Sequence, residues 1–211
     1  MKLKAVIFDL DQTLVDSRKI HLDSYIIPLN KRSMYPKLED VASSFGTFEH
    51  VIFRKFSPKS SEEEIRRMII ERKQVLLEEV SQTKKIPYSD EILQSLKVKV
   101  KIALATGTFG EITYKTLEMF DWKKYFDAIV VGEEIKKSRP DPEILNTALN
   151  KLKIDADKAI YVGDSIYDVQ CANNANMKVI VLGDFKEADY TAKNLLEVKN
   201  ILENLIDKNQ V

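Results

Sequence analysis

Two carboxylates separated by a single residue, Asp9 and Asp11, directly follow the apolar run 5–8 of this sequence. Four consecutive apolar residues predict a short strand buried on both faces, and the ligand-binding crevice of a parallel sheet opens at the carboxyl ends of its strands. Two like charges this close to a core are costly unless a cation or a proton compensates them. The pair therefore indicates a metal site or a shared-proton site, with a solvated turn as the plainer alternative.

A second acidic group follows another apolar run. Asp164 comes shortly after the run 159–162, and Asp168 lies four residues later, on the following turn. We expect both to face the point where Asp9 and Asp11 emerge, and four converging carboxylates would repel one another unless a hard divalent cation relieved the repulsion. Mg²⁺ prefers oxygen ligands and fits such a site. The alternative is that Asp164 only caps the helix that follows.

Candidate anion-binding residues follow the next predicted strand. Thr106 and Gly107 come after the apolar run 102–105, where a hydroxyl group and backbone N–H groups can hold phosphate oxygens. Further along, three basic residues precede a helix that begins at a proline, and a cation there would balance a dianionic phosphate. These basic residues are Lys136, Lys137 and Arg139. Taken singly, an ordinary turn and a solvated loop explain the two segments equally well.

The composition narrows the class of protein. The 211 residues contain 33 Lys and Arg and 33 Asp and Glu, so no basic excess points to nucleic acid. The single Cys171 forms no internal disulfide, and His21 and His50 do not have the spacing of zinc ligands. The apolar stretch at the N-terminus meets Asp9 too early for a signal peptide or a membrane span. We expect a globular, cytoplasmic protein without nucleic-acid or membrane partners, either a monomer or a homodimer.

Apolar runs alternate with stretches of helical spacing along most of the chain. This alternation predicts an α/β fold with a doubly wound parallel sheet. The expected strands are 5–8, 102–105, 128–131, 159–162 and 179–182, and clear helices are expected over 144–152 and 195–206.

The interval between the first two strands has helical spacing and no convincing strand. Helical faces are expected over 22–29 and 38–45, and Ser61 with Glu64 forms a capping box at the start of a third helix. A crossover needs only one helix. We therefore predict an inserted helical cap over residues 16–86, with residues 1–15 and 87–211 forming the sheet domain.

The segments DLDQTL, ATGT, SRPDPE and GDSIYD, in this order, resemble the four motifs of the haloacid dehalogenase superfamily. The resemblance covers the whole chain, because the helical insert resembles the first type of cap in that superfamily. VDS at residues 15–17, followed by His21, resembles the branch of phosphoglycolate phosphatase and β-phosphoglucomutase. Four motifs in order are far more specific than any one of them.

This resemblance implies a Mg²⁺-dependent phosphatase that hydrolyses a small phosphorylated metabolite through an aspartyl-phosphate. Asp9 would be the nucleophile and Asp11 the general acid and base, with crowding by like charges raising the proton affinity of Asp11. Mg²⁺ would be held by Asp9, the backbone carbonyl of Asp11, and Asp164, with Asp168 as a ligand or an orienting residue. Thr106 would bind the phosphoryl oxygens.

The sequence departs from the family pattern at two positions. Gln12 stands where many members have glycine, and Arg139 stands where the third motif usually has lysine. Arginine also occurs at this position in members of the superfamily that resemble phosphonoacetaldehyde hydrolase, and its fork can bind phosphate. We expect Arg139, ahead of Lys136 or Lys137, to contact the phosphate because it directly precedes a proline.

Substrate choice should lie in the cap. Phe45 and Gly46 are candidates for a specificity loop, and a plain helix C-cap explains them equally well. A sugar phosphomutase would use the same Asp9 and Asp11. A phosphonate-cleaving enzyme would need a cap lysine for a Schiff base, with Lys31 and Lys55 as candidates by type. Outside enzymes, a phospho-acceptor signalling domain shares the sheet and the acids but lacks a large insert.

Overall fold

The computed structural model describes residues 3–207 and has at its centre a 6-stranded sheet in the order β5-β4-β1-β6-β7-β8. Every neighbouring pair in this sheet runs parallel. The strands are β1 (Ala5–Phe8), β4 (Lys101–Ala105), β5 (Ala128–Val130), β6 (Ala159–Gly163), β7 (Lys178–Leu182) and β8 (Tyr190–Ala192). The predicted α/β fold with a doubly wound parallel sheet is confirmed.

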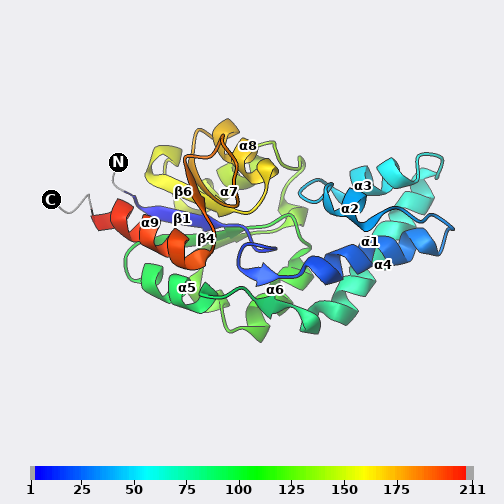
Figure 1. Cartoon of the computed structure of the whole chain (residues 1–211), viewed down its shortest axis with the longest axis horizontal. Coiled ribbons are helices and arrows are strands. Elements are labelled where there is room, and N and C mark those ends of the chain that lie inside the picture. Colours follow the sequence, from blue (N-terminus) through cyan, green and yellow to red (C-terminus); the bar gives the residue numbers. More distant parts are fainter. Residues whose placement is uncertain (1–2, 208–211) are drawn as a thin grey trace.

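Helices cover both faces of the sheet (Figure 1). They are α5 (Ser89–Lys97), α6 (Gly110–Met119), α7 (Glu143–Leu152), α8 (Ile166–Asn174) and α9 (Leu195–Asp207), with short 3₁₀ turns η1 (Val80–Gln82), η2 (Lys123–Tyr125), η3 (Gly132–Glu134) and η4 (Ala156–Lys158). Side chains of α5 and α9 pack on one face, and those of α7 and α8 pack on the other.

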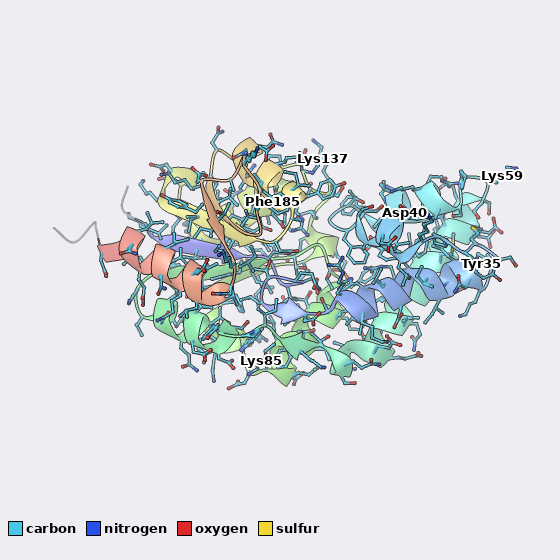
Figure 2. The ribbon with its side chains drawn as sticks, viewed as in Figure 1. Tyr35, Asp40, Lys59, Lys85, Lys137 and Phe185 are labelled. Atoms are coloured by element: carbon cyan, nitrogen blue, oxygen red, sulfur yellow. The ribbon has the colours of Figure 1, made fainter. Side chains whose placement is uncertain are left out.

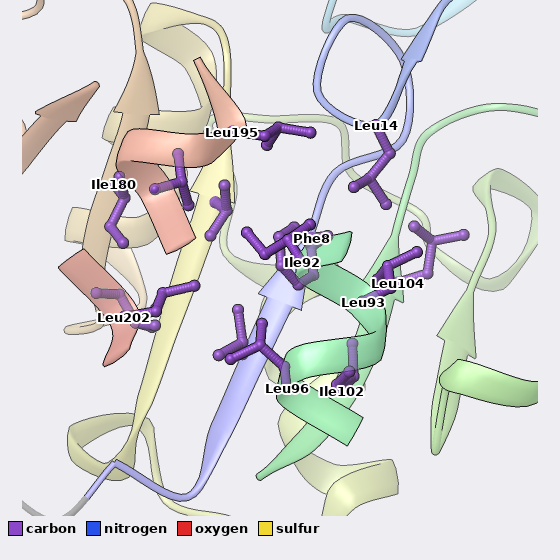
Figure 3. Packing of buried hydrophobic residues seen from close by; sticks show 14 of the residues in the cluster. Phe8, Leu14, Ile92, Leu93, Leu96, Ile102, Leu104, Ile180, Leu195 and Leu202 are labelled. Atoms are coloured by element: carbon purple, nitrogen blue, oxygen red, sulfur yellow. The ribbon is translucent and has the colours of Figure 1, made fainter. Parts of the chain in front are cut away.

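Alternation along β1 divides the core between these two faces, because successive side chains of a strand point in opposite directions. Val6 and Phe8 contact the α5 and α9 side, whereas Ala5 and Ile7 contact the α7 and α8 side, and all four are fully buried. Figure 3 shows Phe8 packed against Ile92 of α5. This two-sided burial explains why the strand reads as one continuous apolar run.

The register of β1 places the acidic loops side by side. Phe8 pairs with Leu104 of β4 on one side and with Val162 of β6 on the other. The chain therefore leaves all three strands at the same edge of the sheet, where Asp9 and Asp164 follow.

The segment 16–86, here called the cap, contains the helices α1 (Arg18–Asn30), α2 (Leu38–Ala42), α3 (Glu49–Phe56) and α4 (Glu62–Glu79). They lie together at one end of the molecule, with the labelled Tyr35 and Lys59 at its tip (Figures 1 and 2). A separate apolar cluster holds them together, made of Tyr25, Leu29, Val41, Ile52, Phe53, Ile65 and Met68.

Two short strands connect the cap to the sheet domain. β2 (Val15–Asp16) and β3 (Lys84–Lys85) pair antiparallel. Next to them, the Leu14 carbonyl accepts hydrogen bonds from the Ile86 N–H at 3.0 Å and from the Ser89 hydroxyl at 2.7 Å. The chain thus enters and leaves the cap at one place.

The cap also packs directly on the sheet domain. Ile20, Leu76 and Val80 form an apolar cluster with Ile112 of α6. Lys73 of α4 makes an ion pair with Glu111 at 2.8 Å. These contacts hold the cap against the edge of the sheet that carries the acids.

Several elements differ from the expectation. The second cap helix ends at Ala42, not Phe45, and the sequence pattern missed α3, β8 and the connecting strands β2 and β3. Pro142 lies at the N-cap of α7, just before the helix. The capping box of Ser61 and Glu64 is confirmed. Over residues 3–207, none of the helices combines the length and the apolarity that a membrane crossing demands.

Candidate active site

Asp9 lies at the tip of β1, only 3% exposed. Its backbone N–H donates to the Val162 carbonyl at 2.9 Å, which continues the pairing of β1 with β6. Its Oδ2 lies 3.3 Å from Nη1 of Arg139, whereas its Oδ1 is buried without a hydrogen-bond partner among the described residues. A buried carboxylate oxygen without a partner is costly unless a ligand completes it.

Asp168 is fully buried and accepts hydrogen bonds on both oxygens. Oδ1 accepts from Arg139 Nη1 and, at 2.9 Å, from the Tyr161 hydroxyl. Oδ2 accepts from the hydroxyl of Ser165 at 2.6 Å and from the backbone N–H groups of Ser165 and Asp164. With its oxygens thus engaged, Asp168 is placed to orient Arg139 and the loop after β6.

The local sequence around the loop after β6 lets Asp168 approach the end of the strand closely. Ser165 is the N-cap of α8 and shares a capping box with Asp168, so Asp164 is not the cap. A Cβ at Gly163 would lie 2.6 Å from the side chain of Asp168. Only glycine therefore lets the buried carboxylate approach this strand end.

Three carboxylates converge at the strand edge. Among the described residues, Asp9, Asp164 and Asp168 each offer one carboxylate oxygen, and these three oxygens lie within 4.8 Å of one another. Carboxylate oxygens are the donors that hard divalent cations prefer, and the unpartnered Oδ1 of Asp9 fits such a ligand. Because both oxygens of Asp168 are engaged, Asp9 and Asp164 are the better candidates for direct contact with a cation. The side-chain carboxylate of Asp11 lies outside this group.

Burial and charge set the protonation of these acids. Burial raises the pKa of Asp9 well above its usual value, opposed by Arg139 and reinforced by Asp168 and Asp164. Burial, with the charge of Asp168, raises the pKa of Asp164 to about 7. For Asp168 burial also acts upward, but Arg139 and the hydrogen bonds hold its pKa below the usual value. A bound cation would favour the charged forms of its ligands.

Asp11 has quite different neighbours. Its Oδ1 accepts a hydrogen bond from the Ser17 hydroxyl at 2.6 Å and lies 3.0 Å from Nε2 of His21. Its Oδ2 accepts from the Thr108 hydroxyl at 2.6 Å. Burial acts to raise the pKa of Asp11, but the close approach of His21 and the hydrogen bonds from His21, Ser17 and Thr108 lower it well below its usual value. This corrects the expectation that crowding by like charges would raise its proton affinity.

The side chain of Ser17 does not cap the helix that follows it. It occupies the N-cap position of α1, yet its side chain makes no capping hydrogen bond there and donates to Asp11 instead. Capping by serine typically contributes about 1 kcal/mol. The hydroxyl thus serves the site in place of its own helix.

Arg72, a buried arginine of the cap, contacts the ring nitrogen of His21 that does not face Asp11. Arg72 is 4% exposed and its Nη2 lies 3.3 Å from Nδ1 of His21. Arginine has no acceptor, so Nδ1 accepts this hydrogen bond, which leaves Nε2 as the ring nitrogen that carries a proton toward Asp11. Arg72 therefore fixes the tautomer in which His21 donates to Asp11.

The predicted phosphate-binding residues take different positions. Thr106 is 1% exposed, its hydroxyl oxygen accepts from the Thr108 N–H at 3.1 Å, and it is not among the residues that line the cavity over the acids. Gly107 and Thr108 do line it. The predicted role of Thr106 toward phosphate stays a prediction, and the structure places Thr108 at the site in addition.

Among the three basic candidates, the structure brings only Arg139 to the acids. Its side chain is 10% exposed, and burial, which would lower its pKa, is outweighed by Asp168 and Asp9, which raise it further. Lys137 is 71% exposed, pairs with Asp141 at 3.3 Å, and lies at the surface of the sheet domain (Figure 2). Neither Lys136 nor Lys137 lines the cavity.

A cavity of about 300 Å³ lies between the acids and the cap. Phe45 and Gly46 line it, and Phe45 also packs against the rings of His21 and Tyr25. Gly46 has φ +98°, and a Cβ there would lie 3.0 Å from the ring of Tyr167 on the opposite wall. The C-cap interpretation is wrong, because α2 ends at Ala42 with Ser43 as its C-cap, whereas Phe45 packs in the cap and also lines the cavity, and its role in specificity stays a prediction.

The lysines suggested for a Schiff base lie elsewhere. Lys31 is 60% exposed and pairs with Glu71, and Lys55 donates to the Ser44 hydroxyl. Neither lines the cavity, so the described residues offer no support for the phosphonate-cleaving alternative.

Sequence reasoning missed Ser17, Thr108, Arg72 and Tyr161 as parts of the site. Thr108 had a usable signal, because it follows Thr106 and Gly107 at a strand end. Arg72 had none, since it sits among other charged residues of a long helix and reaches the site only through the packing of the cap.

Comparisons with known proteins agree with this geometry. Residues 6–182 match the family described as haloacid dehalogenase-like hydrolase. A phosphorylated carbohydrates phosphatase of Thermotoga maritima is 30% identical over 184 residues, covering 84% of each chain. A pyrophosphatase PpaX of Bacillus mycoides is 29% identical over 187 residues, covering 86% of this chain and 84% of the relative.

A phosphoglycolate phosphatase of Aquifex aeolicus is 29% identical over 180 residues, covering 83% of each chain. Among solved structures, a β-phosphoglucomutase from Clostridium difficile superposes with a TM-score of 0.89 at 20% identity, covering 98% of each chain, which shows the shared fold. The predicted resemblance is confirmed: this chain belongs to the haloacid dehalogenase-like hydrolase family, within its phosphatases.

Proposed function

We propose that the chain is a Mg²⁺-dependent phosphatase that hydrolyses a small phosphomonoester through an aspartyl-phosphate on Asp9. One observation carries this proposal: Asp9 and Asp11 line the same cavity, and the buried Oδ1 of Asp9 has no hydrogen-bond partner among the described residues. A nucleophile needs an oxygen free for attack, whereas a proton-transfer group needs hydrogen-bond partners that hold it in place, and the two carboxylates differ in this way.

Asp9 is placed to attack phosphorus, forming a new P–O bond as the bond to the leaving oxygen breaks. Arg139, 3.3 Å from Asp9 and held by Asp168, is placed to bind the phosphoryl oxygens as their charge spreads. Mg²⁺, held by Asp9 and Asp164 with Asp168 as the orienting residue, would neutralise charge between the carboxylates and the phosphoryl group.

Asp11 is placed to move the proton. Arrival of a phosphoryl dianion raises the proton affinity of a neighbouring carboxyl group, so the pair of Asp11 and His21 can deliver a proton to the leaving oxygen. In the second step Asp11 takes a proton from water as that water attacks phosphorus. The P–O bond to Asp9 then breaks, which releases inorganic phosphate and restores the carboxylate.

The test is Asp9→Asn, assayed for phosphate release from an aryl phosphate in the presence of Mg²⁺. We expect a loss of about 10⁴-fold or more in kcat, because the nucleophile is removed. Asp184→Asn is the matched control, since Asp184 follows β7 but is exposed and outside the cavity. Wild-type activity in Asp9→Asn would refute the proposal.

The alternative functions predict different outcomes in the same experiments. Isomerisation of a sugar phosphate without net phosphate release would favour a mutase. A long-lived phosphate on Asp9 without turnover would favour a signalling domain. Binding of Mg²⁺ is measured separately by calorimetry, and Asp164→Asn should weaken it.

A further inference from the structure

The cap wall of the cavity carries a carboxylate that the proposed chemistry does not use. Glu49, the first residue of α3, lines the cavity with its side chain 17% exposed. Among the described residues, its one hydrogen-bond partner is Arg72, whose Nη1 lies 3.5 Å from Oε1. Contact at that length leaves most of the hydrogen-bonding capacity of the carboxylate free.

Arg72 uses both terminal nitrogens, while its buried Nε has no hydrogen-bond partner among the described residues. One Nη bonds to His21 and the other faces Glu49, while the guanidinium lies 4.4 Å from the ring centroid of Tyr25 and 5.3 Å from that of Phe109. Because Arg72 is 4% exposed and Glu49 17%, and both terminal nitrogens of Arg72 face protein groups, a ligand in the cavity meets Glu49 more readily than this guanidinium.

The leaving group of a bound ester must occupy this part of the cavity. The proposed function puts the phosphoryl group between Asp9 and Arg139, and the remaining lining residues of the cap include Tyr25, Phe45 and Glu49. A partly buried carboxylate accepts hydrogen bonds from hydroxyl groups and repels a second negative charge, and both effects are stronger away from bulk water.

We propose that Glu49 selects phosphate esters of neutral polyhydroxy compounds, such as phosphorylated carbohydrates, and rejects esters whose leaving group is anionic. This inference rests on the proposed function and names the substrate class of the same site. The relatives differ in the substrates that their names state, and Glu49 supplies a physical reason for this chain to favour one of them.

Arg18 would have the opposite effect on specificity, because its positive charge attracts an anionic leaving group. It lines the same cavity, it is exposed, and no acid pairs with its guanidinium among the described residues. Exposed charges are screened by solvent and salt, so Arg18 acts more weakly on a ligand than a partly buried Glu49. If Arg18 nevertheless dominated, a carboxylate or second phosphate on the leaving group would bind well.

The test compares kcat/KM for a hexose monophosphate with kcat/KM for 2-phosphoglycolate and for pyrophosphate. We expect wild type to favour the hexose ester, and Glu49→Gln to shift the ratio toward the anionic substrates by about tenfold, because the variant removes the charge while keeping the size. Glu62→Gln is the matched control, since Glu62 also pairs with an arginine of the cap, Arg54, but lies outside the cavity.

The outcomes separate the two proposals. An unchanged ratio in folded Glu49→Gln, or a wild-type preference for 2-phosphoglycolate that Arg18→Gln abolishes, overturns the role of Glu49 while leaving the phosphatase intact. Failure of wild type to hydrolyse any phosphomonoester, an aryl phosphate included, overturns the proposed function itself. Thermal unfolding of each variant shows whether it is folded.

Discussion

Asp9 and Asp11 are two residues apart, yet different parts of the molecule hold them. The neighbours of Asp9 all come from the sheet domain: Arg139, Asp164 and Asp168. Asp11 instead contacts Ser17 and His21 from the cap, together with Thr108 from the sheet domain. The side that handles phosphorus is thus built by the sheet domain alone, while the side that moves protons also needs a docked cap.

This difference suggests a division of labour that kinetics can separate. Substitutions beside Asp9 should reduce the rate for every leaving group alike. Substitutions beside Asp11 should matter most where the leaving oxygen is basic and needs a proton, and least for an aryl phosphate, whose leaving group departs unprotonated.

The largest effect is expected from Arg139→Met, which leaves Asp9 and Asp168 without their shared cation. Removing one partner of a buried ion pair typically costs about 3–5 kcal/mol in the free energy of unfolding. We expect denaturant unfolding to show a loss of this size, with activity lost for alkyl and aryl phosphates in equal measure. Arg139→Lys restores the charge and should recover part of the stability; unaltered stability in Arg139→Met would contradict the buried network.

The next effect is expected from His21→Asn. Loss of the side chain that faces Asp11 should lower kcat for an alkyl phosphate by about 10²-fold, the scale of general acid catalysis, and by much less for an aryl phosphate. His50→Asn is the control, because His50 is exposed and outside the cavity. Equal losses with both substrates would show that His21 acts on the attack at phosphorus. That result would contradict the proposed division of roles between the neighbours of Asp9 and those of Asp11.

A smaller effect is expected from Thr108→Val, which removes the hydroxyl donor to Oδ2 of Asp11 at nearly constant volume. A hydrogen bond to a charged group is commonly worth about tenfold in rate, and we expect that loss in kcat/KM for the alkyl ester. Thr113→Val serves as control, since the buried hydroxyl of Thr113 has no partner among the described residues. If the two variants behaved alike, the contact of Thr108 with Asp11 would carry no function.

The smallest effect is expected from Gly46→Ala. Its φ of +98° disfavours a side chain, and the new Cβ would lie 3.0 Å from the ring of Tyr167 across the cavity. We expect looser docking of the cap, measured as an increase of a few-fold in KM with little change in kcat. A lowered kcat at constant KM would show that Gly46 acts on chemistry instead.

The acids at the strand tips were predictable from the sequence. A buried parallel strand reads as a continuous apolar run, and its end marks where a ligand binds, so Asp9 and Asp164 could be assigned to one edge from their spacing alone. Arg139 could be singled out only through its place before a proline. Its ion pairs with Asp9 and Asp168 and its hydrogen bond to the Tyr161 hydroxyl form only once β1, β6 and the segment before α7 are packed together.

The elements that escaped prediction are those whose pattern is too short to read. α3 buries only Ile52 and Phe53 in eight residues and begins without a capping side chain, and β8 has three residues. The shift in pKa of Asp11 escaped for another reason. It depends on His21 and Thr108, which meet only once the cap is packed against the sheet domain.

The two-residue ribbon of β2 and β3 has a consequence for how such enzymes diversify. Because the chain departs at Val15 and returns at Lys85 directly opposite, everything between them can be exchanged without altering the spacing of the sheet strands. The side chains that must be kept are those that reach the sheet domain or support them: Ser17, His21 and Arg72 near Asp11, and the apolar cluster of Ile20, Leu76 and Val80 on Ile112. The cap can therefore be replaced to change the specificity, while the sheet domain that carries the proposed phosphate-binding residues stays unchanged.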